Sequence, residues 1–324
     1  MNLNKNSFLT SSKEINEITN SSKQSKTITD IFSWGILAIA VIALAFSPVF
    51  TKLSEIEISP TATIFNRLWI ATIIMGVWQL IQTPTDFPAL NLKEFKFEYK
   101  QQGLLILASI SATASSVLWA ISFTQTSIAS STVLRSLTPL FISLGAWLIL
   151  KQQFNRQFII GMTLAIIGGM VIGWDDLHLS TEYLVGDSIA IASAALHGAN
   201  ILTVGYLRDR NCTVSRVLFW RCGFGALIVL PVVWFTDVQL FPITLQGWLM
   251  VIALAFVCQT FGQGLLVYSL KKFSSSFVGI VTLLKPIFTA FLAWIIFRET
   301  VSLTSGGALL LILLGIYLAK SSSD

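Results

Sequence analysis

The sequence LTPLFISLGAWLILKQ at 137–152 returns in related form as LKPIFTAFLAWIIFRE at 284–299. In both copies a proline near the start is followed by a long apolar run, and a cation closes the run. The positions that match at this constant spacing are Leu137 and Leu284, Pro139 and Pro286, Phe141 and Phe288, Ala146 and Ala293, Trp147 and Trp294, Lys151 and Arg298, and Gly168 and Gly315. An apolar segment that occurs twice predicts a chain built from two homologous halves.

The composition indicates a membrane protein. Hydrophobic residues make up 54% of the chain and charged residues only 11%, whereas soluble domains carry roughly 25% charged residues. The three cysteines are odd in number and match no disulfide or metal spacing, so no metal site is expected. The net charge of +5 would suggest nucleic acid as a partner of a soluble protein. In this chain the net positive charge comes from lysines and arginines in the loops between apolar segments, so no nucleic-acid partner is expected.

From Phe32 onward the sequence divides into apolar segments, each about long enough to cross a bilayer core of roughly 30 Å. The ten segments are 32–51, 61–82, 103–123, 127–150, 157–174, 184–206, 214–235, 247–269, 274–297 and 304–320. The predicted fold class is therefore all-α integral membrane, with ten transmembrane helices that contact membrane lipid.

The segments form two sets of five around a polar connection. Residues 31–174 are predicted to be the first repeat and 184–320 the second, joined by an external loop at 175–183. Residues 1–30 are polar and lack apolar periodicity, which predicts a disordered cytoplasmic tail. Because each repeat has an odd number of helices, the second must be inverted in the membrane relative to the first.

Loop charges predict the orientation of the chain. With a cytoplasmic N-terminus, the outer side receives only Lys52 and Arg298. The cytoplasmic side and the tail receive Lys5, Lys13, Lys23, Lys26, Lys93, Lys96, Lys100, Lys151, Arg156, Arg208, Arg210, Arg216, Lys271, Lys272 and Lys320. Because cytoplasmic loops are rich in lysine and arginine, we expect a multi-pass protein of the plasma (inner) membrane with both termini in the cytoplasm.

Four cations fall within apolar segments: Arg67, Arg135, Arg221 and Lys285. Each costs about 2.5–3.5 kcal/mol at a bilayer centre, and such residues usually face a cavity or a partner. Arg67 and Arg221 follow a phenylalanine by two residues at corresponding places in the repeats, and snorkelling to an interface is an equally good interpretation for these two. Lys285 and Arg135 lie deeper, beside the prolines, and favour a polar cavity. No acidic residue lies equally deep, so an anionic group on a ligand is the simplest compensation.

Neutral polar side chains on single helix faces complete the candidate site. The faces combine Ser109, Thr113, Ser116 and Trp119; Gln259 and Gln263; and His197 and Asn200. Hydrogen bonding between helices is the alternative interpretation of these groups. His197 could also couple transport to protons, because histidine titrates near neutral pH.

Prolines and glycines predict local features of the helices. Pro139 and Pro286 are expected to interrupt their helices, which frees a carbonyl one turn earlier and opens space beside Lys285. Glycine runs near Gly168 and Gly315 predict close contacts between helices or between subunits, which would fit a homodimer.

The ten segments, the five-plus-five duplication and the paired proline helices resemble the drug/metabolite transporter superfamily, specifically its EamA-type members. The resemblance covers residues 32–320. The terminal glutamate typical of the family is present as Glu299, whereas the first repeat has Gln152. Lys285 before Pro286 resembles the lysine-lined sites of organophosphate-carrying relatives. The resemblance implies alternating access without cofactors, for amino acids, drugs, sugar phosphates or nucleotide sugars.

The leading hypothesis is a secondary transporter of a small organic metabolite that carries an anionic group. Its predicted substrate-binding residues are Lys285, Arg135, Arg67, Arg221, Trp119, Gln259, Gln263, Asn200 and His197. The alternative is an amino-acid or drug exporter without anion preference. An integral-membrane enzyme has little support, because Asp175, Asp176 and His178 form the only acid–histidine cluster. Direct ATP drive is not expected either, because there is no GxxxxGK[ST] motif. A scaffold would not explain the buried cations.

Overall fold

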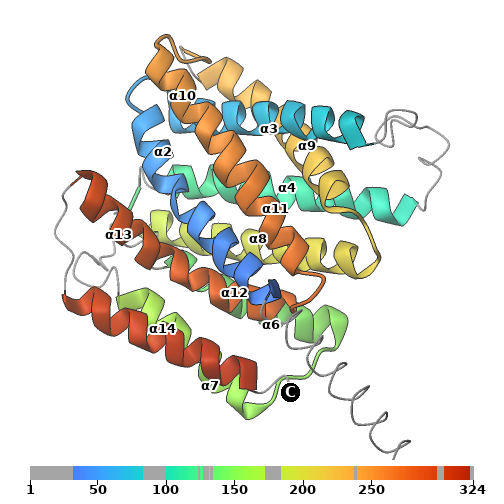
Figure 1. Ribbon diagram of the computed structural model, residues 1–324, viewed down its shortest axis with the longest axis vertical. Coiled ribbons are helices and arrows are strands. Elements are labelled where there is room, and N and C mark those ends of the chain that lie inside the picture. The colour runs from blue at the N-terminus through green and yellow to red at the C-terminus, as the bar shows by residue number, and fades with distance from the viewer. Residues whose placement is uncertain are drawn as a thin grey trace, which may run out of the picture.

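The computed structural model describes residues 32–82, 99–122, 125–126, 131, 134–171, 184–236, 239–297 and 303–321. Within these ranges all regular structure is helical, as predicted (Figure 1). The predicted tail at 1–30 and the predicted connection at 175–183 lie outside the described residues. The all-α class is therefore confirmed for the described part of the chain.

Each predicted apolar segment contains helix. Residues 32–45 are helical, and the elements that follow are α2 (Ser47–Ser54), α3 (Pro60–Gln82), α4 (Tyr99–Ser122), α6 (Thr138–Leu150), α7 (Arg156–Val171), α8 (Leu184–Asp209), α9 (Val214–Thr236), α10 (Leu245–Ala253), the π-helix η4 (Leu254–Gly262), α11 (Gln263–Ser269), α12 (Ser275–Val281), the 3-10 turn η5 (Thr282–Leu284), α13 (Lys285–Phe297) and α14 (Leu303–Ser321).

Six helical stretches of the described chain are long and apolar enough to cross a bilayer by length and composition. They are Phe32–Ser54, Pro60–Ile81, Gln101–Ser122, Leu184–Asp209, Val214–Thr236 and Leu245–Ser269. The others are shorter apolar helices, including Thr138–Leu150 and Arg156–Val171. The chain is thus a multi-pass membrane protein, and the count of ten crossings in two inverted repeats stays a prediction.

The predicted interruptions at the paired prolines are present, although each proline lies in the first turn of the new helix rather than in a helix interior. Pro139 is in the first turn of α6, which begins at Thr138. Pro286 is the second residue of α13, after the 3-10 turn Thr282–Leu284. The first turn of a helix has backbone N–H groups without acceptors, so proline costs nothing there. Each proline therefore starts a new helical segment.

Helices from the two halves interleave. α3 packs along α9, α4 along α8, and α7 along α14, and in Figure 1 the chain end α14 lies beside α7. Each of these pairs joins one helix from residues 31–174 to one from 184–320. The centre of the bundle is consequently lined by helices from both halves.

Glycine allows the closest of these approaches. A Cβ at Gly161 of α7 would lie 2.5 Å from the Gly315 carbonyl oxygen of α14, and a Cβ at Gly315 would lie 2.5 Å from the Gly161 carbonyl oxygen. No side chain fits at such distances, so the backbones touch directly. The predicted role of the glycine runs in helix–helix contact is confirmed at this pair.

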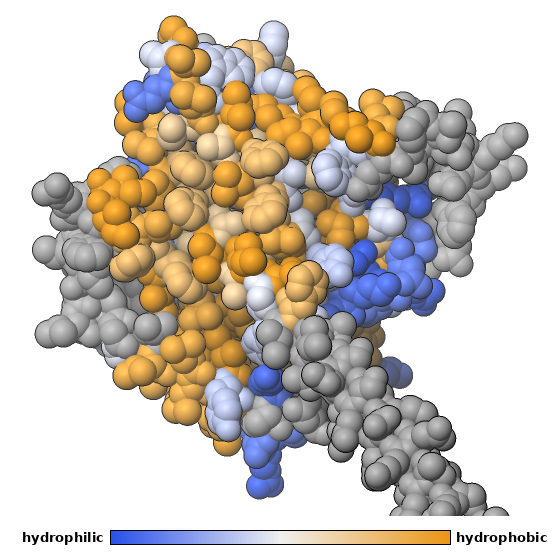
Figure 2. All heavy atoms as spheres, viewed as in Figure 1, coloured by the Kyte–Doolittle hydropathy of each residue, from blue (hydrophilic) through white to orange (hydrophobic). Residues whose placement is uncertain are grey.

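The outer surface is suited to lipid. Large apolar side chains such as Leu148, Ile149, Trp234 and Phe235 are more than half exposed. Figure 2 shows one broad hydrophobic face, with hydrophilic residues gathered towards its margins. A bilayer solvates such a face, whereas water would drive its aggregation.

Candidate functional site

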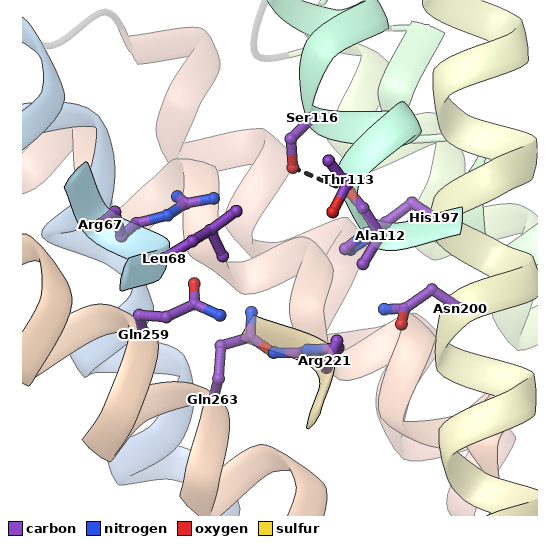
Figure 3. Close-up of a pocket in the computed structure, with 10 residues that line it drawn as sticks. All are labelled: Arg67, Leu68, Ala112, Thr113, Ser116, His197, Asn200, Arg221, Gln259 and Gln263. Carbon is purple, nitrogen blue, oxygen red and sulfur yellow. Dashed lines mark hydrogen bonds between the residues drawn. The ribbon is translucent and has the colours of Figure 1, made fainter. Parts of the chain in front are cut away.

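A polar cavity lies between the two halves of the bundle. It measures about 400 Å³ including its open side and is lined by Arg67, Leu68, Ala112, Thr113, Ser116, His197, Asn200, Arg221, Gln259 and Gln263. Figure 3 shows these side chains converging from separate helices on one space. Six of the nine predicted site residues are among them.

Six helical elements supply the described lining. From the first half, α3 contributes Arg67 and α4 contributes Thr113 and Ser116. From the second half come His197 and Asn200 on α8, Arg221 on α9, Gln259 on η4 and Gln263 on α11. The predicted placement of the polar faces of these helices towards a common centre is what the packing produces.

Arg221 is firmly held at the cavity wall. Its side chain is only 5% exposed, and its Nη2 donates to Oε1 of Gln263 at 3.3 Å. On the next residue of α9, the Cys222 Sγ accepts a hydrogen bond from Gln259 Nε2 at 3.3 Å. The two glutamines therefore connect α9 to the η4–α11 segment on either side of the guanidinium.

Arg67 points into the same space from the opposite half (Figure 3). Its Nε is buried and has no acceptor among the described residues, and its charge lies close enough to interact with Arg221. Both arginines line the cavity, which is the position that the cavity interpretation predicts for them. The two residues occupy corresponding places in the two halves, each after a phenylalanine two positions earlier.

A second cationic group lies beside the cavity rather than in its lining. Arg135 sits over the Trp119 ring at 4.7 Å and donates through Nη1 to the hydroxyl of Ser193. Lys285, the first residue of α13, is close enough to Arg135 for their charges to interact. Arg135, Lys285 and Trp119 are thus absent from the described lining, and their part in substrate binding stays a prediction.

His197 lies near both cationic groups. It lines the cavity, and its imidazole interacts electrostatically with Arg135, Lys285 and Arg221. The described residues that line the cavity include two arginines and no carboxylate. A site of this kind repels cations and offers several donors to an anion.

Some of the predicted polar face serves packing instead. Ser109 donates to the backbone carbonyl oxygens of Leu105 and Trp220, so it joins α4 to α9 and does not line the cavity. Conversely, Leu68 and Ala112 line the cavity but are apolar residues in apolar segments. No sequence signal separates them from lipid-facing or core positions.

The π-helix was also not predicted. η4 covers Leu254–Gly262 in the middle of a long apolar stretch and carries Gln259. Single π-turns inside α-helices frequently occur at functional sites. Here the wider turn lies where the helix meets the cavity, and the regular helix resumes at Gln263.

Comparison with known proteins gives consistent matches over the whole membrane part. A model of the EamA-like transporter family matches residues 33–174 and, a second time, residues 184–320. Two curated relatives, the pseudopaline exporters CntI of Pseudomonas aeruginosa strains UCBPP-PA14 and PAO1, are each 21% identical over 299 residues, which is 91% of this chain and 99% of the relative.

A solved crystal structure has the same fold. It superposes with a TM-score of 0.75 at 14% identity, and the match covers 89% of this chain and 97% of that chain. The resemblance seen in the paired proline segments is confirmed by the family match, which takes in both halves. The chain belongs to the EamA-like transporter family.

Proposed function

We propose that this chain is a secondary transporter that moves a small organic anion across the membrane by alternating access. The family supplies the transporter function. The anion preference rests on the cavity, where Arg67 and Arg221 meet without a carboxylate among the described lining residues. Uncompensated cations buried in a membrane protein are costly, and an anionic substrate compensates them while it is bound.

Alternating access is supported by the way the halves share the cavity. Arg67 comes from the first half and Arg221 from the second, at corresponding positions. In transporters with inverted repeats the substrate site lies at the repeat interface, and one repeat rocks against the other around it. The loop cations favour a cytoplasmic location for both termini. The relatives that are named exporters favour outward transport.

Transport by purified protein in proteoliposomes tests the proposal. Counterflow of labelled organic anions should be saturable and should exceed that of neutral compounds of equal size. Arg221→Gln should lower it at least about tenfold, because the variant keeps length and polarity but leaves the anion without its buried cation. Arg210→Gln is the matched control, since Arg210 is exposed and its side chain donates to the Tyr206 hydroxyl, away from the cavity lining.

The alternative is an exporter without anion preference. Equal counterflow of neutral and anionic compounds, with Arg221→Gln as active as Arg210→Gln, would contradict the anion proposal and support this alternative. In that case the arginines would serve only to hold the helices around the cavity.

A further inference from the structure

The cavity holds neutral acceptors as well as cations, and an anion alone leaves these acceptors without partners. Carboxylates and phosphates accept hydrogen bonds and cannot donate them when ionised. Two lining groups, on Ser116 and Gln259, are arranged to accept hydrogen bonds from a ligand in the cavity. They come from α4 in the first half of the chain and η4 in the second.

The Ser116 hydroxyl donates its only hydrogen within its own helix. Its Oγ donates to the backbone carbonyl oxygen of Ala112 at 3.0 Å, and Figure 3 shows this bond at the edge of the cavity. A hydroxyl has one hydrogen and two lone pairs. Towards a ligand, Ser116 is therefore an acceptor.

The amide nitrogen of Gln259 fixes the orientation of its side chain. Its amide nitrogen donates to Cys222 Sγ at 3.3 Å, which turns the carbonyl oxygen towards the space below Arg67 and Leu68 in Figure 3. The side chain is 6% exposed. Its orientation is thus set within the protein, and it offers an acceptor to the cavity.

Asn200 presents its other polar atom to the cavity. The residue is 3% exposed, its Oδ1 is buried with no donor among the described residues, and in Figure 3 its amide nitrogen points into the space. Towards a ligand, Asn200 is therefore a donor, and it suits the anionic end.

We infer that the substrate is an organic anion that also carries hydroxyl groups, with Ser116 and Gln259 as the residues that recognise them. This inference rests on the proposed function. Its ligand class is that of hydroxy acids and hydroxylated phosphate esters, which present the same combination of anion and hydroxyl. The arginines bind the anionic end, and the two acceptors bind the hydroxyl groups.

An ammonium group is a poorer donor for this site. It would bring a positive charge next to Arg67 and Arg221, with no carboxylate among the described lining residues to compensate it. Like charges at such short range in a buried site repel strongly. A neutral hydroxyl meets the same acceptors without that repulsion, so the cavity favours hydroxy acids over amino acids of equal length.

Binding to the purified full-length protein, with matched six-carbon probes, tests the inference. Hexanoate, 2-hydroxyhexanoate and norleucine differ only in one substituent, and gluconate adds further hydroxyl groups. We expect 2-hydroxyhexanoate to bind about tenfold more tightly than hexanoate, and norleucine to bind more weakly than 2-hydroxyhexanoate. Glycerol 3-phosphate compared with propyl phosphate shows whether the anion is a phosphate or a carboxylate.

Two variants separate hydroxyl recognition from anion binding. Gln259→Met, and independently Ser116→Ala, should reduce the preference for 2-hydroxyhexanoate over hexanoate to about twofold or less, while hexanoate still binds. Gln263→Met is the matched control. Because Gln263 holds Arg221, this change should weaken both probes by the same factor and leave the preference intact.

The possible failures are distinct. Equal binding of hexanoate and 2-hydroxyhexanoate, tighter binding of norleucine, or a preference that survives both variants overturns this inference and leaves the proposed anion transporter standing. If none of the anions binds, the proposed function itself is overturned, and this inference falls with it.

Discussion

Single charged residues in apolar segments are the most informative signal in the sequence. A buried cation is costly enough that it must face a cavity or a partner, so the sequence alone makes Arg67 and Arg221 candidates for a site. Leu68 and Ala112 line the same cavity and have no such signal, because an apolar residue in an apolar helix is equally at home facing lipid, core or ligand.

Lys285 illustrates the limit of this signal. Its depth in the sequence predicts a cavity position, but the described lining does not include it, and it lies beside Arg135 instead. We expect Lys285→Met to weaken anion binding only a few fold, through the lost long-range attraction. Arg221→Gln, which removes a lining cation, should cost about tenfold or more.

Titration of both variants with the same labelled anion provides the measurement. Loss of all binding in Lys285→Met, with Arg221→Gln near normal, would reverse the expected order of the two contributions. That result would mean that the anion binds nearer to α13 than to α9.

At the scale of helices, the backbone contact between α7 and α14 gives a direct prediction. Gly161→Ala places a Cβ 2.5 Å from the Gly315 carbonyl oxygen, and a helix backbone cannot yield at that point without separating the pair. Such overpacking typically costs about 1–3 kcal/mol, so the unfolding temperature of the detergent-solubilised protein should fall clearly.

Gly307→Ala is the matched control, because a Cβ there would have nothing within 4 Å. Its unfolding temperature should stay unchanged or rise slightly, since alanine favours helix over glycine. Equal stability of the two variants would mean that α7 and α14 do not touch at Gly161.

The connection between α2 and α3 caps the beginning of α10 from a distant part of the chain. Glu57 accepts hydrogen bonds from the backbone N–H groups of Ile243 and Thr244, each at 3.1 Å, and from the Thr244 hydroxyl. A Cβ at Gly247 would lie 2.5 Å from Oε2 of Glu57. Hydrogen bonds from Thr244 hold the pKa of the Glu57 carboxyl below its usual value of 4.5.

The lowered pKa of Glu57 predicts how the stability of this contact depends on pH. A carboxyl whose pKa is lower in the folded state stabilises the contact above the ordinary pKa, and the contribution is lost as the pH falls through the lower, folded value. Hydrogen exchange at the Ile243 and Thr244 amides should therefore be slow near neutral pH, after correction for intrinsic rates. It should accelerate relative to the amides within α10 below about pH 4.5.

Glu57→Gln should give fast exchange at both amides at every pH. Glu55→Gln is the control, because Glu55 lies in the same connection and takes no part in the described hydrogen bonds at Ile243 and Thr244. Acceleration in Glu55→Gln alone would show that Glu57 does not cap α10.

For the whole molecule, the sequence predicts where helices lie and where proline breaks them, but not the π-helix. Every predicted segment contains helix, because apolar length is a strong signal. The breaks before Pro139 and Pro286 follow from the prolines, whereas the π-helix at Leu254–Gly262 has no such residue to mark it. Since η4 carries Gln259, the detailed shape of the cavity depends on a feature with no sequence signature.

The central claim is that one cavity, shared by the two halves, opens to each side of the membrane in turn. A cysteine at Ala112, in the cavity lining, tests it when Cys212, Cys222 and Cys258 are replaced by serine. An impermeant thiol reagent is applied to right-side-out and to inverted membrane vesicles. We expect labelling from both sides, with protection by a transported anion and none by its neutral analogue. Labelling from one side only, unaffected by any anion, would contradict the account.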